Sequence, residues 1–260
     1  MKLTVLSDAK ARNGFRSEHG LSFYIEADQR RLLFDTGASQ TFIHNAERLG
    51  IDLDHIDMVV LSHGHYDHGD GLPFVKHTTL VSHPGCFVRR YRKKGHEYLG
   101  ISLDGKEIRD RFDLRPSEKP FRLSEHLYFL GEIPRIHGFE SWESPYILEN
   151  GKEDLIVDDS GLACVTESGL VVVSGCAHSG ICNMTSHAIK IAGVKKVRAV
   201  IGGFHLKNAD ERTRKTVEYF KEMGVKDVYP SHCTMGPALE MFHEVFGLNE
   251  VKVGQEFLFD

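Results

Sequence analysis

The first third of the 260-residue chain predicts mainly strands, whereas the last third predicts strands that alternate with helices. This difference restricts the possible folds. Short runs rich in β-branched and aromatic residues open the chain and predict strands: LTVL, SFYIE, RLLF and DMVVL. From LVVVS onward, strands alternate with helices predicted near 184–192, 210–223 and 237–246, each followed by a glycine suited to a helix end. This order predicts an α/β protein, a four-layer αββα sandwich of two packed sheets with helices outside.

The composition is that of an ordinary folded protein, with 41% hydrophobic and 27% charged residues. A chain of this length can bury one large core, so we expect a single domain over residues 1–260. Residues 89–120 are dense in charge and poor in apolar periodicity, which predicts an insertion or lid. The segment 133–146, with the sole tryptophan Trp142, is predicted to be either a substrate loop or an aromatic cover for the core.

Charge, hydropathy and cysteine content indicate which partners and which cellular compartment to expect. A net charge of −5 from 37 acidic and 32 basic residues gives no general field that attracts nucleic acid, so no nucleic-acid partner is expected. No apolar run approaches the ~18 residues of a membrane helix, and the start MKLTVLSDAK turns polar too early for a secretory signal. Five scattered cysteines without a C-x-x-C pair argue against disulfides. These features predict a cytoplasmic protein with a small-molecule substrate and no membrane partner.

The segment LSHGHYDHG at residues 61–69 carries the strongest chemical signal. It follows the predicted strand DMVVL and places four potential metal ligands within six positions, namely His63, His65, Asp67 and His68. Two histidines two positions apart on extended backbone point the same way and can occupy adjacent corners of a tetrahedral site. The aspartate and histidine on the following turn suit a second ion. We predict a site for one or two divalent ions, zinc first, with manganese or iron as alternatives.

Three further histidines follow predicted strands in the second half of the chain: His178 after LVVVSGCA, His205 after VRAVIGGF and His232 after KDVYPS. Because α/β sheets build their sites beyond the carboxyl ends of strands, we expect all three at one edge. His178 is predicted to be the third ligand of the first metal, with a structural turn histidine as the alternative. His205 is expected either to bind substrate and handle protons or to pack in the interior.

These residues also carry a family resemblance. SHGHYDHGDGL is similar to the H-x-H-x-D-H signature of the metallo-β-lactamase superfamily, and FDTG at residues 34–37 resembles its upstream aspartate motif. Within the superfamily, the stretches EHGLS, FDTGAS, SGCAHSGICN, IGGFHL and YPSHCTMG resemble a group of cytoplasmic proteins related to an archaeal dihydropterin-ribofuranosylaminobenzene phosphate synthase. The resemblance implies the αββα fold, makes Asp35 a residue that orients a ligand histidine, and makes His232 a ligand of the second metal. The alternative is that Asp35 caps the following turn and that His232 caps the end of a strand.

The sequence departs from the superfamily at one ligand position. Many members supply a bridging aspartate in a Gly-Asp pair after a strand, and this chain has Gly175-Cys176. Cys176 is expected to be either a thiolate ligand or a small buried residue. Asp158 and Asp159 are alternative oxygen donors, unless they are solvated turn acids.

The expected reaction follows from a pair of metal ions. Two ions close together bring the pKa of a shared water toward neutrality and polarise a phosphoryl oxygen, while Asp67 orients that water or receives its proton. We therefore predict a metal-dependent hydrolase of a small anionic, phosphoester-like substrate. The resemblance implies an alternative, a transferase similar to the synthase, and a non-catalytic metal- or ligand-binding protein on the same scaffold is the third. The basic run 89–94 is either an anion-binding surface or a solvated face.

Overall fold

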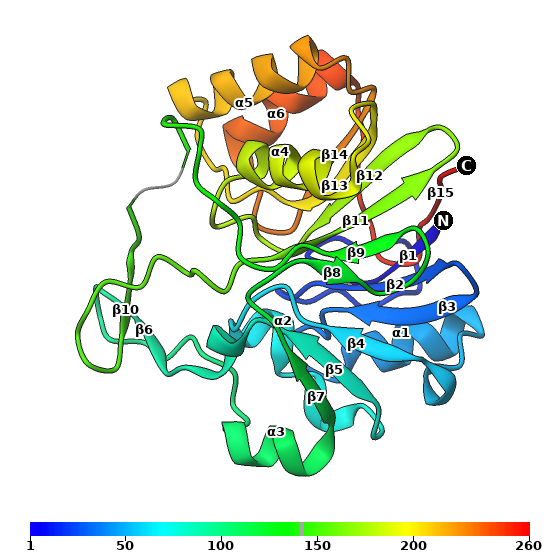
Figure 1. The fold of residues 1–260 in the computed structure, drawn as a ribbon, viewed down its shortest axis with the longest axis vertical. Coiled ribbons are helices and arrows are strands. Elements are labelled where there is room, and N and C mark those ends of the chain that lie inside the picture. The colour runs from blue at the N-terminus through cyan, green and yellow to red at the C-terminus, as the bar shows by residue number, and fades with distance from the viewer. Residues whose placement is uncertain (141–142) are drawn as a thin grey trace.

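Two β-sheets packed face to face form the centre of the computed structural model, which describes residues 1–140 and 143–260 (Figure 1). Trp142 lies outside the described residues. The first sheet has the order β15 (Glu256–Leu258), β1 (Lys2–Ser7), β2 (Ser22–Ala27), β3 (Arg30–Phe34), β4 (Met58–Val60), β5 (Thr79–Ser82), β7 (Asp113–Pro116). The second has the order β14 (Asp227–Ser231), β13 (Val197–Gly203), β12 (Gly169–Ser174), β11 (Gly161–Thr166), β9 (Leu127–Phe129), β8 (Phe121–Arg122).

Helices cover the outer face of each sheet. The helices α4 (Ile181–Ala192), α5 (Glu211–Glu222) and α6 (Gly236–Phe246) pack on the second sheet, on the side of Figure 1 away from the first. The first sheet is covered by α1 (Thr41–Leu49) and α3 (Gly105–Arg111), while the short α2 (Tyr66–Gly69) follows β4. The predicted four-layer αββα order is therefore confirmed.

Apolar side chains from both sheets meet in the space between them. Leu3, Phe23 and Phe34 of the first sheet and Leu162 and Val173 of the second are completely buried in this shared cluster. Each such side chain contributes roughly 1.5–3 kcal/mol to folding through its removal from water. The core thus fixes the two sheets against each other and aligns the strand ends at their common edge.

Two of the helices end at glycines in the left-handed conformation. Gly50 and Gly193 end α1 and α4 with φ of 69°, the left-handed conformation that a residue without Cβ adopts at little cost. At the start of α1, the Ser39 hydroxyl accepts a hydrogen bond from the Thr41 backbone N–H at 3.1 Å. No helix in the described part of the chain is long and apolar enough to cross a membrane.

The charged segment 89–120 contains one helix and two strands. It includes α3, the strand β7 of the first sheet, and β6 (Arg90–Arg92), which pairs with β10 (Tyr146–Leu148) in a separate ribbon. Within the basic run, Arg90 is only 1% exposed and forms ion pairs with Asp158 at 2.8 Å and Asp154 at 3.3 Å. One arginine of the run is therefore a core residue, whereas its neighbours Arg89 and Arg92 reach solvent.

Candidate metal centre

The histidine motif and the later histidines meet at one edge of the two sheets. In the first sheet, β3, β4 and β5 run parallel, and the loop after β4 carries His63 and His65. In the second, β12, β13 and β14 run parallel, and their ends carry His178, His205 and His232. Because the core aligns the sheets, both sets of strand ends reach the same place.

The backbone at these strand ends is bent. Asp35, Ala177, His205 and His232 have φ of 60°, 51°, 51° and 53°, the left-handed region that residues with a Cβ rarely adopt. Such conformations cost of order 1–3 kcal/mol each and gather at functional sites. They follow β3, β12, β13 and β14, so each bend turns the chain out of its strand at the shared edge.

A first cluster consists of His63, His65 and His178, which are all buried and each offer a ring nitrogen within 4.8 Å of the others. His63 Nε2 lies 2.9 Å from His65 Nδ1, and the rings of His63 and His178 have centroids 4.8 Å apart. Burial lowers the pKa of all three, that of His65 to about 3, because an imidazolium is poorly solvated there. The rings are therefore neutral at pH 7, as metal ligands must be.

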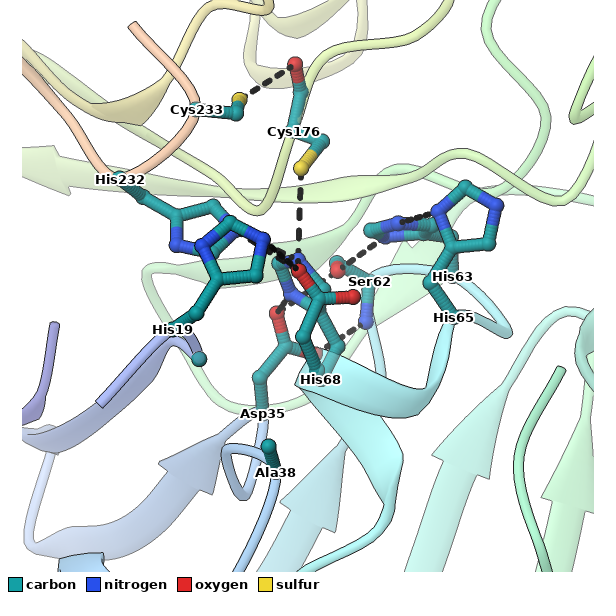
Figure 2. A network of polar contacts seen from close by, with 12 residues as sticks. His19, Asp35, Ala38, Ser62, His63, His65, His68, Cys176, His232 and Cys233 are labelled. Atoms are coloured by element: carbon teal, nitrogen blue, oxygen red, sulfur yellow. Dashed lines mark hydrogen bonds and ion pairs between the residues drawn. The ribbon is translucent and has the colours of Figure 1, made fainter. Parts of the chain in front are cut away.

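A second cluster lies beside the first, as Figure 2 shows, and combines carboxylate, imidazole and thiol groups. Asp67 Oδ2 lies 3.3 Å from His232 Nε2 and 3.8 Å from His68 Nε2. Cys176 Sγ lies 3.3 Å from the same His68 nitrogen. Burial opposes ionisation of Asp67, but the neighbouring His68 and His232 rings outweigh it and lower the carboxyl pKa. Hard oxygen, nitrogen and soft sulfur donors thus converge within one cluster.

Asp35 holds the second cluster from behind. His68 Nδ1 donates to Asp35 Oδ2 at 2.7 Å, and the same carboxylate accepts from the Ser62 backbone N–H and hydroxyl, both at 2.7 Å. A carboxylate on one ring nitrogen fixes the tautomer and directs the lone pair of the other nitrogen outward. In Figure 2 the Asp35 side chain lies below His68, and Cys176 lies on the opposite side of that ring.

Asp158 and Asp159 lie behind the ligand loops and are buried, so they are not the solvated turn acids that the sequence allowed. Asp158 Oδ2 accepts from the Gly64 backbone N–H at 2.8 Å, between the two motif histidines. Asp159 Oδ2 accepts from the backbone N–H of Ser179 at 3.0 Å and from its hydroxyl, directly after His178. Neither carboxylate belongs to the ligand clusters found among the described residues. They fix the loops that carry His63, His65 and His178.

A cavity of about 100 Å³ opens beside both clusters. His205 lies on its wall, with its ring centroid 4.4 Å from that of His178 and its Nε2 3.4 Å from the Tyr146 hydroxyl. Burial lowers the His205 pKa to about 3, so the ring is neutral at pH 7 and can take part in a hydrogen bond. Two cationic side chains, Arg92 and Lys207, also line the cavity. The wall therefore carries positive charge beside the ligand clusters.

His19 is a site residue that the sequence analysis did not assign a role. Its Nε2 lies 3.3 Å from Asp67 Oδ2, and its ring stacks on His232 with centroids 5.3 Å apart. His19 forms a potential ligand group with Asp67 and His232. His19 lies in the stretch EHGLS, which resembles the family. No other potential metal ligand stands at a telling spacing from it, so the sequence alone did not indicate a role.

The donor set fits divalent metal ions. Two nitrogens on one tetrahedral zinc ion with bonds of about 2.0–2.1 Å lie about 3.3 Å apart. This is close to the 2.9 Å between His63 Nε2 and His65 Nδ1 and the 3.1 Å between His68 Nε2 and His232 Nε2. His178 Nε2 is buried without a hydrogen-bond partner among the described residues, although the His178 ring contacts those of His63 and His65. A buried, unpartnered nitrogen normally indicates a missing partner. Both clusters can therefore hold a metal ion.

Comparison with known proteins agrees with this site. A family model described as the metallo-beta-lactamase superfamily matches residues 17–141. The chain is 39% identical over 255 residues to the 7,8-dihydropterin-6-methyl-4-(beta-D-ribofuranosyl)-aminobenzene-5'-phosphate synthase of Methanocaldococcus jannaschii, covering 89% of this chain and 86% of that protein. The crystal structure of Tm1679, described as a metal-dependent hydrolase of the beta-lactamase superfamily, is 32% identical, with a TM-score of 0.89 over 100% of this chain and 99% of that one. A diphosphatase of the PhnP family shares the fold alone, with a TM-score of 0.58 at 16% identity, covering 100% of this chain and 98% of that one. The chain belongs to the metallo-β-lactamase superfamily, within the group that resembles the archaeal synthase.

Proposed function

We propose that this protein is a metal-dependent hydrolase that acts on a small phosphoester-like anion. The observation that carries the proposal is one cavity bordered by His65 and His178 of the first cluster, by Asp67 of the second, and by the cations Arg92 and Lys207. Neutral imidazoles and a carboxylate suit divalent ions, and the two cations suit a phosphoryl group. The arrangement thus brings anion binding and metal binding to one point.

The ligands divide into two sets. In this proposal His63, His65 and His178 hold the first ion. Asp67, His68 and His232, whose ligand atoms lie 3.1–3.8 Å apart, hold the second, with zinc as the expected metal. Cys176 stands where many relatives supply a bridging aspartate, and its sulfur lies against His68. We assign it to the second ion as a thiolate ligand.

The side chains of the cavity divide the work of hydrolysis. When bound, the ions activate water and polarise the phosphoryl oxygen. Arg92 and Lys207 bind the anionic oxygens of the substrate and hold it beside the clusters. Asp67 orients the water, and neutral His205, hydrogen-bonded to Tyr146, positions the leaving group through a hydrogen bond.

A transferase reaction is the second candidate, favoured by 39% identity over most of the chain to a protein named as a dihydropterin-linked phosphate synthase. The metal centre and the cationic wall serve either reaction, because both place a phosphorylated substrate beside polarising ions. The two candidates differ in whether water or a second substrate attacks.

Metal removal tests the proposal. The purified protein is expected to contain one to two divalent ions per chain and to hydrolyse at least one of p-nitrophenyl phosphate and bis(p-nitrophenyl) phosphate. Chelation should reduce turnover at least about 100-fold, and added zinc should restore it, because the site itself stays folded. Elemental analysis and release of p-nitrophenol measure both effects. Turnover that survives complete metal removal contradicts the proposal, and full metal content with no turnover of either ester or of a pterin substrate panel indicates a binding protein.

Cobalt substitution tests the Cys176 assignment without relying on activity. Cobalt-loaded protein is expected to show a thiolate-to-cobalt charge-transfer band in the near ultraviolet, and Cys176→Ser should abolish it, because serine oxygen gives no such transition. Cys233→Ser is the matched control, since Cys233 is also buried beside His232. The band should persist in that variant. A band that survives in Cys176→Ser and disappears in Cys233→Ser would transfer the ligand role to Cys233.

A further inference from the structure

Two cysteines share a wall of the cavity at the metal centre. Cys176 follows β12, Cys233 follows β14, and both line this cavity. Their sulfur atoms lie within 4.8 Å of each other and of a ring nitrogen of His232. Because the S–S bond of a disulfide is about 2.05 Å long, the two sulfurs need to approach each other by less than about 3 Å to be joined. The proposed metal chemistry uses the sulfur of Cys176 and leaves that of Cys233 free.

The strand between the two cysteines ends in a glycine that brings them close together. β13 lies between β12 and β14 in the second sheet, and Gly203 is its last residue. A Cβ on Gly203 would overlap the Gly175 carbonyl oxygen and would lie 2.6 Å from the Cys233 sulfur. The φ of Gly203 is not left-handed, so its backbone conformation alone does not require glycine. The missing side chain therefore provides space, and it lets the neighbouring strand ends hold both cysteines against the same cavity.

Each sulfur has its own polar contacts. Cys176 Sγ lies 3.3 Å from His68 Nε2, on the side where the second ion is proposed. Cys233 Sγ accepts a hydrogen bond from the His205 backbone N–H at 3.2 Å and lies 3.8 Å from the Cys176 carbonyl oxygen. Figure 2 shows the Cys176 sulfur directed at His68 and the Cys233 sulfur directed at that carbonyl oxygen. The two side chains thus approach each other from different strand ends without being bonded.

The cavity gives small oxidants access to this pair. Cys176 and Cys233 are only 4% and 6% exposed, and the exposed part of each borders the cavity of about 100 Å³. That volume is larger than the roughly 30 Å³ that one water molecule occupies in the liquid, so a peroxide of two heavy atoms fits. A thiol on another protein cannot reach so far inside. Oxidation is therefore directed toward a bond between these two cysteines.

We propose that Cys176 and Cys233 are a peroxide-sensitive pair whose reversible disulfide prevents binding of the second metal ion. Formation of the disulfide follows from the positions of the two sulfurs. Its effect on metal binding rests on the proposed function, which assigns the Cys176 thiolate to the second ion. A thiolate is the form of cysteine that binds metal, and a sulfur in a disulfide has lost that charge. The disulfide and the metal–sulfur bond therefore exclude each other.

The oxidation consumes one hydrogen peroxide and two thiols. The Cys233 sulfur attacks one peroxide oxygen, the O–O bond breaks, and one water leaves behind a sulfenic acid on Cys233. The Cys176 sulfur then attacks the sulfenic sulfur, the S–O bond breaks, and a second water leaves. The two thiols lose two electrons and two protons, and the peroxide is reduced to two waters. A metal ion on the Cys176 sulfur competes with the second step, so bound metal protects the pair.

Peroxide treatment of the purified protein, with and without zinc, tests the proposal. Chelated protein exposed to hydrogen peroxide is expected to lose two free thiols per chain, which thiol titration measures. Mass spectrometry of peptides without reduction should find Cys176 joined to Cys233, and dithiothreitol should separate them. Elemental analysis should show that the oxidised protein takes up one ion fewer than the reduced protein. Zinc-loaded protein should form the link at least about tenfold more slowly, because the metal holds the attacking thiolate.

Two variants separate this pair from the other cysteines. Cys233→Ser should form no link under peroxide, while it still takes up both ions before oxidation. Cys164→Ser is the matched control, because Cys164 is also buried but lies within β11 and does not line the cavity at the metal centre. This control should form the link at the wild-type rate. The peptide mapping of wild-type protein gives the same information if a variant fails to fold.

Three outcomes decide between the claims. Chelated wild-type protein that keeps all its thiols under peroxide, or a link between other cysteines, overturns the proposal. Linked protein that binds as many ions as the reduced protein also overturns it, because the disulfide then has no effect on the metal. Linkage with loss of one ion, in a protein whose reduced and metal-loaded form hydrolyses no ester, supports this proposal and contradicts only the hydrolase.

Discussion

Replacing His65 with alanine is expected to remove most of the metal from the first cluster and to lower metal-dependent turnover by about 10³-fold. His65 Nδ1 lies 2.9 Å from His63 Nε2, so its loss leaves only two nitrogens of the first cluster. Losing a partner behind a ligand already costs 10–100-fold in metal affinity, and loss of the ligand itself costs more. The expected rate loss corresponds to about 4 kcal/mol, within the several kcal/mol that metal polarisation supplies.

The matched control is His55→Ala, because the His55 side chain is 70% exposed and pairs with Asp52 away from the site. That variant should keep its metal and its turnover. Thermal unfolding with and without zinc adds a second readout, since an ion that binds only the folded state raises Tm in wild type and far less in His65→Ala. Full metal content and wild-type turnover in His65→Ala would exclude the ring from the site.

Replacing Gly64 with alanine is expected to destabilise the protein by about 2–3 kcal/mol and to disturb both motif histidines at once. A Cβ at this position would overlap the backbone carbonyl of Cys86, which has no flexible end that can move aside. The Gly64 N–H also donates to Asp158, so any shift of the loop breaks a buried hydrogen bond. Urea unfolding and elemental analysis should therefore report lower stability and lower metal content together.

Gly138→Ala is the control for this change. A Cβ on Gly138 meets nothing within 4 Å, and its backbone is not left-handed, so the substitution should change stability by no more than about 0.5 kcal/mol. If Gly64→Ala unfolds at the wild-type urea concentration with its metal retained, the contact with Cys86 does not constrain the histidine loop.

The local part of the site could be predicted because it depends on spacing alone. His63 and His65 stand two apart beyond β4, so extended backbone brings their nitrogens to 2.9 Å without knowledge of the fold. The common location of the histidines in the second half could be predicted from the alternation of strands and helices, because the parallel strands end at one edge of the sheet. The predicted fold rested on the same alternation, and it matches the observed layers.

The supporting residues could not be predicted because their partners lie far away in sequence. In the sequence, Asp158 resembles an ordinary acidic turn residue. Its contacts with Gly64 and with buried Arg90 form only once the ribbon of β6 and β10 is in place. Arg90 likewise reads as one of a solvated run. His19 reaches Asp67 only because the pairing of β1 with β2 brings the intervening loop to the strand ends. Each contact depends on topology that periodicity does not encode.

Each ligand cluster draws its atoms from both sheets, with His63 and His65 from one and His178 from the other. An ion held there joins the two halves of the chain across their open edge, where the apolar core between the sheets gives way to solvent. Its binding energy then adds to the cohesion of the whole fold. If such an ion binds, we expect its removal to lower the population of folded molecules as well as the turnover of each molecule.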